Sequence, residues 1–176
     1  QLVPLVEYLG SVVNKMPGTS DFADDRFNQY VLSQYDVLAG EFPQNENEAV
    51  LVVGTNNDVT DLTLVQLGLM DEDEFFKTLF GTEEERKEPQ YVDFDRVFAQ
   101  EYTLFYNNAT YTKNAMPMPY FFTHNSEKSS LAVETDAATG RANGVSVKIS
   151  AVLRLKEGRT YGCLASGLNL TEKLVD

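Results

Sequence analysis

The sequence has no tryptophan, one cysteine and one histidine among its 176 residues. With Cys163 alone, the chain can form no internal disulfide and no cysteine-based zinc site. A thiol nucleophile would need His124 as its base, but a lone cysteine in an apolar segment is more typical of a buried small side chain. One histidine also disfavours a histidine-based metal centre, so we expect no cofactor and no metal.

Positive charge and long apolar runs are scarce as well. Fourteen Lys and Arg stand against 27 Asp and Glu, which gives a net charge of −13. Phosphate backbones and anionic lipid headgroups attract clustered basic residues, so no nucleic-acid partner is expected. No run of about 18 apolar residues occurs that could span a membrane. The chain begins at Gln1, without an initiator methionine, which suggests a piece of a longer protein.

The composition is that of a globular domain, with 43% apolar and 11% aromatic residues. A chain of this length is typical of one domain, so we expect a single unit over residues 1–176. Its helix-rich part is expected at about residues 1–88 and its strand-rich part at about 89–176. The predicted fold class is α+β, a mixed sheet with helices packed on one side.

Helical spacing and capping signals predict four helices in the first half, over residues 2–16, 21–38, 62–67 and 71–80. Thr60 or Asp61 can cap the third helix, and Gly68 can end it. Gly40 and Pro43 indicate a loop over residues 35–43. The polar segment that follows leads into an apolar run at residues 50–53, which predicts a buried strand.

Alternating apolar and polar residues predict most strands in the second half. A β-rich part is expected to begin at residues 91–94, and the clearest strand lies at 145–153. Residues 101–106 are expected to pair with 111–113 through a turn at Asn107 and Asn108. Residues 170–175 are predicted to begin a helix.

Carboxylate pairs and oxygen-rich loops invite catalytic and calcium hypotheses, and both are weak. Asp24 with Asp25, and Asp93 with Asp95, could act as a glycosidase pair, but helix caps or exposed surface are the better interpretation. Residues 56–61 alternate Asn, Asp and Thr, yet they lack the glycine and glutamate of an EF-hand loop. None of the common hydrolase, phosphate-loop or dinucleotide motifs is present. We therefore expect no enzyme in this segment.

One cluster of methionine and aromatic side chains is a candidate binding surface. The residues proposed for a partner or substrate surface are Met116, Met118, Tyr120 and Phe121. The alternative is that these side chains pack over the edge of a sheet.

Three blocks of sequence carry a family resemblance. The first is Tyr-Asp-Val-Leu-Ala-Gly-x-x-Pro at residues 35–43 with the strand that follows it, and the second is residues 56–69. The third runs over residues 147–158 and leads into residues 166–174. In this order they resemble the extracellular domain of bacterial ABC transporter permeases of the MacB/FtsX type. Residues 71–140 match nothing in that pattern, and Ala151 stands where the family usually has glycine.

The resemblance implies a transporter part on the extracellular side of the cell membrane. Such permeases insert this domain between transmembrane helices, pair with a cytoplasmic ATPase that binds the ATP, and typically dimerise. They use ATP-driven motion to export or work on peptides, lipid-like molecules or cell-wall partners, a mechanism called mechanotransmission. Two alternatives stay open: a free-standing extracellular binding or adhesion module, and a secreted hydrolase.

Overall fold

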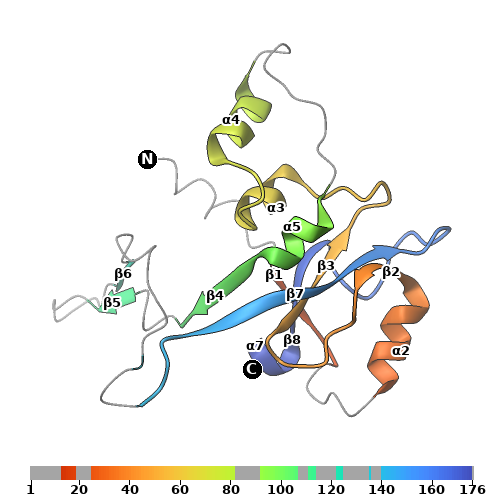
Figure 1. Cartoon of the computed structure of the whole chain (residues 1–176), viewed down its shortest axis with the longest axis horizontal. Helices are drawn as coiled ribbons and strands as arrows, with labels where there is room; N and C mark the ends of the chain where they lie inside the picture. The colour runs from red at the N-terminus through yellow and green to blue at the C-terminus, as the bar shows by residue number, and fades with distance from the viewer. Residues whose placement is uncertain are drawn as a thin grey trace. The chain divides into compact units, whose positions relative to one another are not determined.

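The computed structural model describes residues 13–18, 25–81, 92–106, 111–113, 122–124, 135 and 140–175. They form an α+β fold with a mixed sheet, which confirms the fold class expected from the sequence (Figure 1). By its internal contacts the chain divides into two compact units. The first unit combines Gln1–Gln100 with Lys148–Asp176, and the second is Glu101–Val147.

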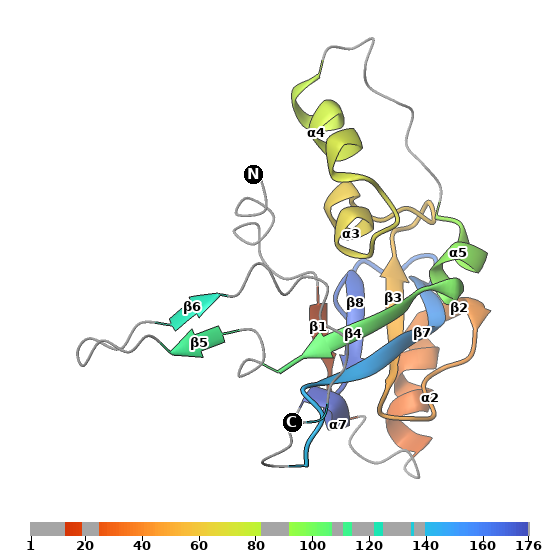
Figure 2. The same cartoon turned by 60° about the vertical axis from the view of Figure 1, so that its left-hand side comes forward.

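The main sheet joins strands that lie far apart in the sequence (Figure 2). Its order is β1-β8-β3-β7-β2, and β4 (Glu101–Phe105) pairs with β7 outside this order. β1 is parallel to β8 and β3 is parallel to β7, whereas the β3–β8 and β2–β7 pairs are antiparallel. The strand bounds are β1 Val13–Met16, β2 Tyr35–Gly40, β3 Glu48–Val53, β7 Gly144–Leu155 and β8 Gly167–Thr171.

Five helices are present in the described residues. Their bounds are α2 Asp25–Gln34, α3 Asp61–Gln66, α4 Glu72–Phe80, α5 Phe94–Ala99 and α7 Glu172–Val175. Thr60, Asp71 and Asp93 cap α3, α4 and α5 by accepting backbone N–H bonds. Nowhere in these ranges does a helix combine the length and apolar character needed to cross a membrane.

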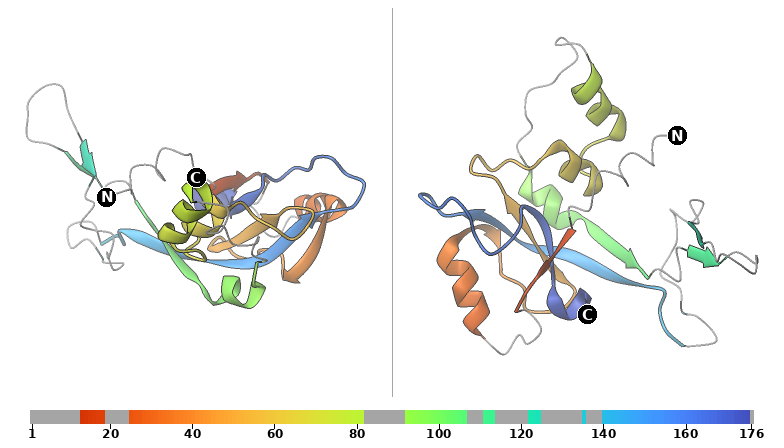
Figure 3. Two further views of the ribbon diagram at one scale, coloured as in Figure 1. Left: turned by 90° about the horizontal axis from the view of Figure 1, so that it is seen from above. Right: turned by 180° about the vertical axis from the view of Figure 1, so that it is seen from behind.

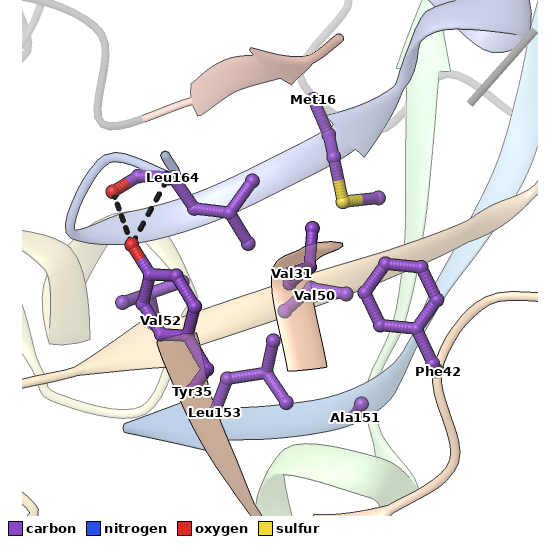
Figure 4. Close-up of a cluster of buried hydrophobic side chains, with 9 residues drawn as sticks. All are labelled: Met16, Val31, Tyr35, Phe42, Val50, Val52, Ala151, Leu153 and Leu164. Carbon is purple, nitrogen blue, oxygen red and sulfur yellow. Dashed lines mark hydrogen bonds between the residues drawn. The ribbon is translucent and has the colours of Figure 1, made fainter. Parts of the chain in front are cut away.

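β3 lies inside the sheet, and all six of its residues are buried. Because side chains alternate along a strand, Val50 and Val52 point to one face while Ala49 and Leu51 point to the other. α2 lies beside β2 and covers the first face through Val31 (Figure 3). The buried cluster on this face contains Met16, Val31, Tyr35, Phe42, Val50, Val52, Ala151, Leu153 and Leu164 (Figure 4). Burial on both faces explains the uninterrupted apolar run at residues 50–53.

The prediction of a loop over residues 35–43 is wrong for the first six of these residues, which form β2. The helix predicted over residues 21–38 accordingly ends at Gln34. These residues form a strand because pairing with β7 gives hydrogen-bond partners to the backbone N–H and C=O groups of β2. Gly40, at φ +74, ends the strand where a side chain would collide with the Ser150 carbonyl oxygen.

The structure corrects two other predictions, one through a tertiary contact and one through a local helix cap. Residues 13–16 form β1 and not the end of a helix, since they pair with β8 and fully bury Met16. The rest of that predicted helix lies outside the described residues. The β-rich part expected to begin at residues 91–94 begins later, at β4, because residues 94–99 form α5, whose first turn is capped by the Asp93 carboxylate.

The pairing of residues 111–113 also differs from the prediction. As β5 (Tyr111–Lys113) they form a separate two-stranded antiparallel sheet with β6 (Phe122–His124), and not a hairpin with β4. The strand at residues 145–153 is confirmed as part of β7. Residues 170 and 171 end β8, and the predicted helix begins after them, as α7.

Candidate functional site

An open polar pocket of about 580 Å³ lies where the loop before β3 meets β7 and α7. Its lining residues are all polar or charged: Gln44, Asn45, Glu46, Asn47, Glu48, Lys148 and Lys173. All of them belong to the first unit. The loop supplies amide and carboxylate groups, and the two lysines supply the positive charge.

Glu48 holds the loop together from the first position of β3. One carboxylate oxygen accepts the Gln44 N–H at 2.8 Å and the Asn45 N–H at 3.3 Å. The other accepts the Asn45 side-chain amide at 3.3 Å and lies 3.3 Å from the Lys148 ammonium. Burial acts to raise the pKa of Glu48, but these hydrogen bonds and Lys148 outweigh it, so the pKa lies below its ordinary value. A carboxylate kept ionised in this way suits a structural anchor better than a general acid.

The loop is also tied to the end of β8. The Thr171 hydroxyl donates a 2.7 Å hydrogen bond to the Glu46 carbonyl oxygen, and the Glu46 carboxylate lies 3.2 Å from the Lys173 ammonium. The Lys148 and Lys173 side chains are 61% and 52% exposed, so both amines face solvent at the pocket. Each lysine already has a carboxylate partner, which leaves the pocket suited to a polar ligand of low net charge.

A second, partly buried polar junction lies at the loop that follows β7. The Tyr35 hydroxyl donates to the Leu164 carbonyl oxygen at 3.0 Å and accepts from the Leu164 N–H at 2.9 Å (Figure 4). The Gln34 side-chain oxygen accepts from the Cys163 N–H at 3.1 Å, and the Lys156 ammonium donates to the Leu32 carbonyl oxygen at 2.7 Å. These bonds fix the loop to the end of α2. Burial raises the pKa of Tyr35, which keeps its hydroxyl protonated.

The candidate binding residues Met116, Met118, Tyr120 and Phe121 lie outside the described residues. The surface that they were predicted to form therefore stays a prediction.

Among the residues considered for catalysis, the structure assigns a structural role to Asp93. Cys163 is half-buried, and burial raises the pKa of its thiol, which disfavours the thiolate that a nucleophile needs. His124 belongs to β6, in the second unit. Asp93 is a helix cap, as expected, and Asp25 is an exposed residue at the start of α2. Asp24 lies outside the described residues.

Hydrogen bonds link the oxygen-rich loop after β3 to α3 and to β7. Thr60 caps α3, which confirms the capping interpretation. The Asn57 side-chain oxygen accepts a 2.8 Å hydrogen bond from the Arg154 guanidinium. Within the described ranges, no three His, Cys, Asp or Glu side chains come together in a group that could hold a metal ion.

The pocket itself was not identified from the sequence. Its local half carries a signal, because Glu48 ends a run of polar residues four positions after Gln44, a spacing at which a carboxylate can cap a loop. Lys148 lies on β7 and Lys173 on α7, which directly follows β8, and both strands pair with β3 across about a hundred residues of chain or more, which no local pattern encodes.

Comparison with protein-family models, curated proteins and solved structures finds no match for this chain.

Proposed function

We propose that this chain is part of the extracellular domain of an ABC transporter permease of the MacB/FtsX type. It would lie on the outer side of the cell membrane, joined to its own transmembrane helices and coupled through them to a cytoplasmic ATPase. ATP would bind to that ATPase and not to this chain. In the full-length protein the permease would act as a dimer.

The main support for this proposal is that the strands of the resembling blocks pair with one another in the sheet. The first block contains β2 and β3, and the third block contains residues 147–155 of β7 and leads into β8. β7 pairs with both β2 and β3, and β3 pairs with β8, so these blocks build one continuous part of the sheet. The second block supplies the loop whose Asn57 is bound by Arg154 of β7. Segments that share a family pattern are expected to form a common scaffold in this way.

The region without resemblance, residues 71–140, includes α4 and α5 of the first unit. It also includes most of the second unit, Glu101–Val147. We expect this part to differ between family members and to determine the cargo, which is a peptide, a lipid-like molecule or a cell-wall partner. The residue numbers of the predicted surface, Met116, Met118, Tyr120 and Phe121, fall within the range of this second unit.

The mechanism requires a domain that moves as a body. A sheet with both faces packed is stiff, because close-packed cores transmit displacement with little internal change. ATP-driven motion of the membrane helices would then move the whole scaffold and any cargo held on it.

The complete reading frame and its neighbouring genes give the first test. The proposal expects apolar runs of about 20 residues on both sides of this chain and an adjacent ATPase gene. The full-length membrane protein, purified in detergent, should then retain that ATPase. A reading frame without flanking membrane helices would favour the free-standing binding module and overturn the proposal.

The candidate surface has its own test in cells. Replacing Met116, Met118 and Phe121 together with serine should reduce resistance to the transported compounds, scored on a panel of antibiotics and antimicrobial peptides. The protein should remain at its normal level in the membrane. Unchanged resistance would remove these residues from the transport mechanism.

A further inference from the structure

We propose that β1 and β8 form a mechanical clamp that carries the load when the domain is pulled through the segments before β1 and after α7. The proposal rests on the proposed function, in which both segments lead to membrane helices. It adds where force enters the fold and which contacts resist it.

The geometry of the two strands is the basis of the clamp. β1 and β8 are adjacent and parallel, with Val13 opposite Leu168 and Met16 opposite Thr171. The chain enters β1 at one end of this pair and leaves β8 at the other end (Figure 2). Opposed forces at these two points slide the strands along each other. Sliding loads all the inter-strand hydrogen bonds together, whereas peeling would break them one after another.

Side chains directly after β8 reinforce the pair. One carboxylate oxygen of Glu172 accepts the Gly18 N–H at 2.9 Å, and the other lies 3.4 Å from the Lys15 ammonium. Glu172 therefore joins the start of α7 to β1 and to the turn that follows it. Met16 and Thr171, the last pair of the register, are both fully buried, so water has little access to the hydrogen bonds beside them.

The position of the clamp in the chain determines what it protects. β2, β3, β7 and the whole second unit lie between β1 and β8 in the sequence. While the clamp holds, force passes from β1 directly into β8 and bypasses everything between them. The core and the second unit can then be moved without being stretched.

Single-molecule force spectroscopy on the 176-residue chain tests this directly. In the first geometry the handles are attached to the two termini. In the second they are attached to a cysteine at position 17 (Pro17→Cys) and to the C-terminus, so that the parallel strands are pulled apart from one end. Cys163→Ala is introduced in both geometries to prevent attachment at the native thiol. We expect the force at the first unfolding event to be at least about twofold higher in the first geometry, because forced unfolding follows the barrier along the pulled direction.

A matched pair of variants identifies the reinforcing contacts. Glu172→Ala should lower the end-to-end unfolding force, since it removes the ion pair with Lys15 of β1 and the hydrogen bond to Gly18 in the turn after β1. Lys173→Ala is the control, because this neighbour pairs with Glu46 and not with β1. Circular dichroism and denaturant midpoints verify that both variants fold.

Equal forces in the two geometries, or equal effects of the two variants, would overturn the clamp. Neither result would touch the proposed function, which depends on the reading frame and the ATPase. If the force measurements support the clamp but the full-length protein does not retain the ATPase, the proposed function alone is overturned.

Discussion

The two units of the chain differ in how much of themselves they bury. In the first unit every residue of β3 and β8 is buried, and a cluster of nine buried side chains packs on one face of the sheet. In the second unit, among the residues whose burial the structure describes, Gly144 and Val147 alone are buried. Buried apolar area is the main source of stability, so the first unit is expected to hold most of it. The second unit is then free to vary in sequence at small cost to the scaffold.

Hydrogen exchange should give the largest contrast between the units. Amides of Leu51 and Leu168, on paired central strands, should exchange only through global unfolding. Amides of β5 and β6 should exchange through local opening, because an isolated two-stranded sheet is marginal in water. We expect rates that differ by about 1,000-fold, measured by mass spectrometry on peptides from each unit. Similar protection in both units would show that the second unit is as stable as the first.

Cavity-creating substitutions should show the same difference between the two units in the free energy of unfolding. Leu153 is fully buried in the nine-residue cluster, so Leu153→Ala should lower the free energy of unfolding by about 2–5 kcal/mol. Leu104, half-buried on β4, is the matched control in the second unit, and Leu104→Ala should cost about 1 kcal/mol or less. Urea denaturation followed by circular dichroism measures both. A larger loss for Leu104 than for Leu153 would contradict the assignment of stability to the first unit.

Tyr35→Phe should weaken the junction between α2 and the loop after β7. The substitution keeps the ring but leaves the Leu164 N–H and carbonyl without their partner in a buried site. The expected loss is about 2 kcal/mol, because unpaired buried polar groups keep their desolvation cost. Tyr161→Phe is the control, since that side chain is 85% exposed and should have no measurable effect. If the two variants are equally stable, water replaces the lost hydroxyl.

Local signals predicted the parts of the fold that depend on near neighbours. The cap at Thr60, the apolar run of β3 and the alternation in β7 all follow from short stretches of chain. β1 and β2 could not be predicted in this way, because their partners β8 and β7 lie more than a hundred residues away. Residues 13–16 fit a helical stripe equally well, and the pairing with β8 decides against it.

The candidate site also has a local part, which near neighbours in the sequence form, and a part that depends on distant strands. Glu48 and the loop that it closes form a local arrangement within five residues, which the sequence could indicate. Lys148 and Lys173 reach the pocket only because β7 and β8 flank β3. The positions of these two lysines depend on long-range strand pairing, which could not be predicted from the sequence.

Glu48→Gln should have the smallest effect, and its pH dependence is the informative part. Glutamine keeps an acceptor oxygen for the Gln44 N–H but loses the charge that faces Lys148, so we expect a loss of about 1 kcal/mol at neutral pH. Since the pKa of Glu48 is lowered on folding from the ordinary value of 4.5, its stabilisation is present above that pH.

On acidification the protein must give up this contribution as the pH falls through the lowered pKa, because the unfolded chain binds the proton more readily. The difference in unfolding free energy between the native protein and Glu48→Gln should therefore shrink below pH 4.5. Glu46→Gln is the matched control, since its pair with Lys173 is half-exposed on both sides and a screened pair contributes little. Denaturant titrations at pH 7 and at a series of acidic values measure all three proteins. A constant difference across the series would mean that the charge of Glu48 does not stabilise the loop, and that the first unit holds its pocket by backbone pairing alone.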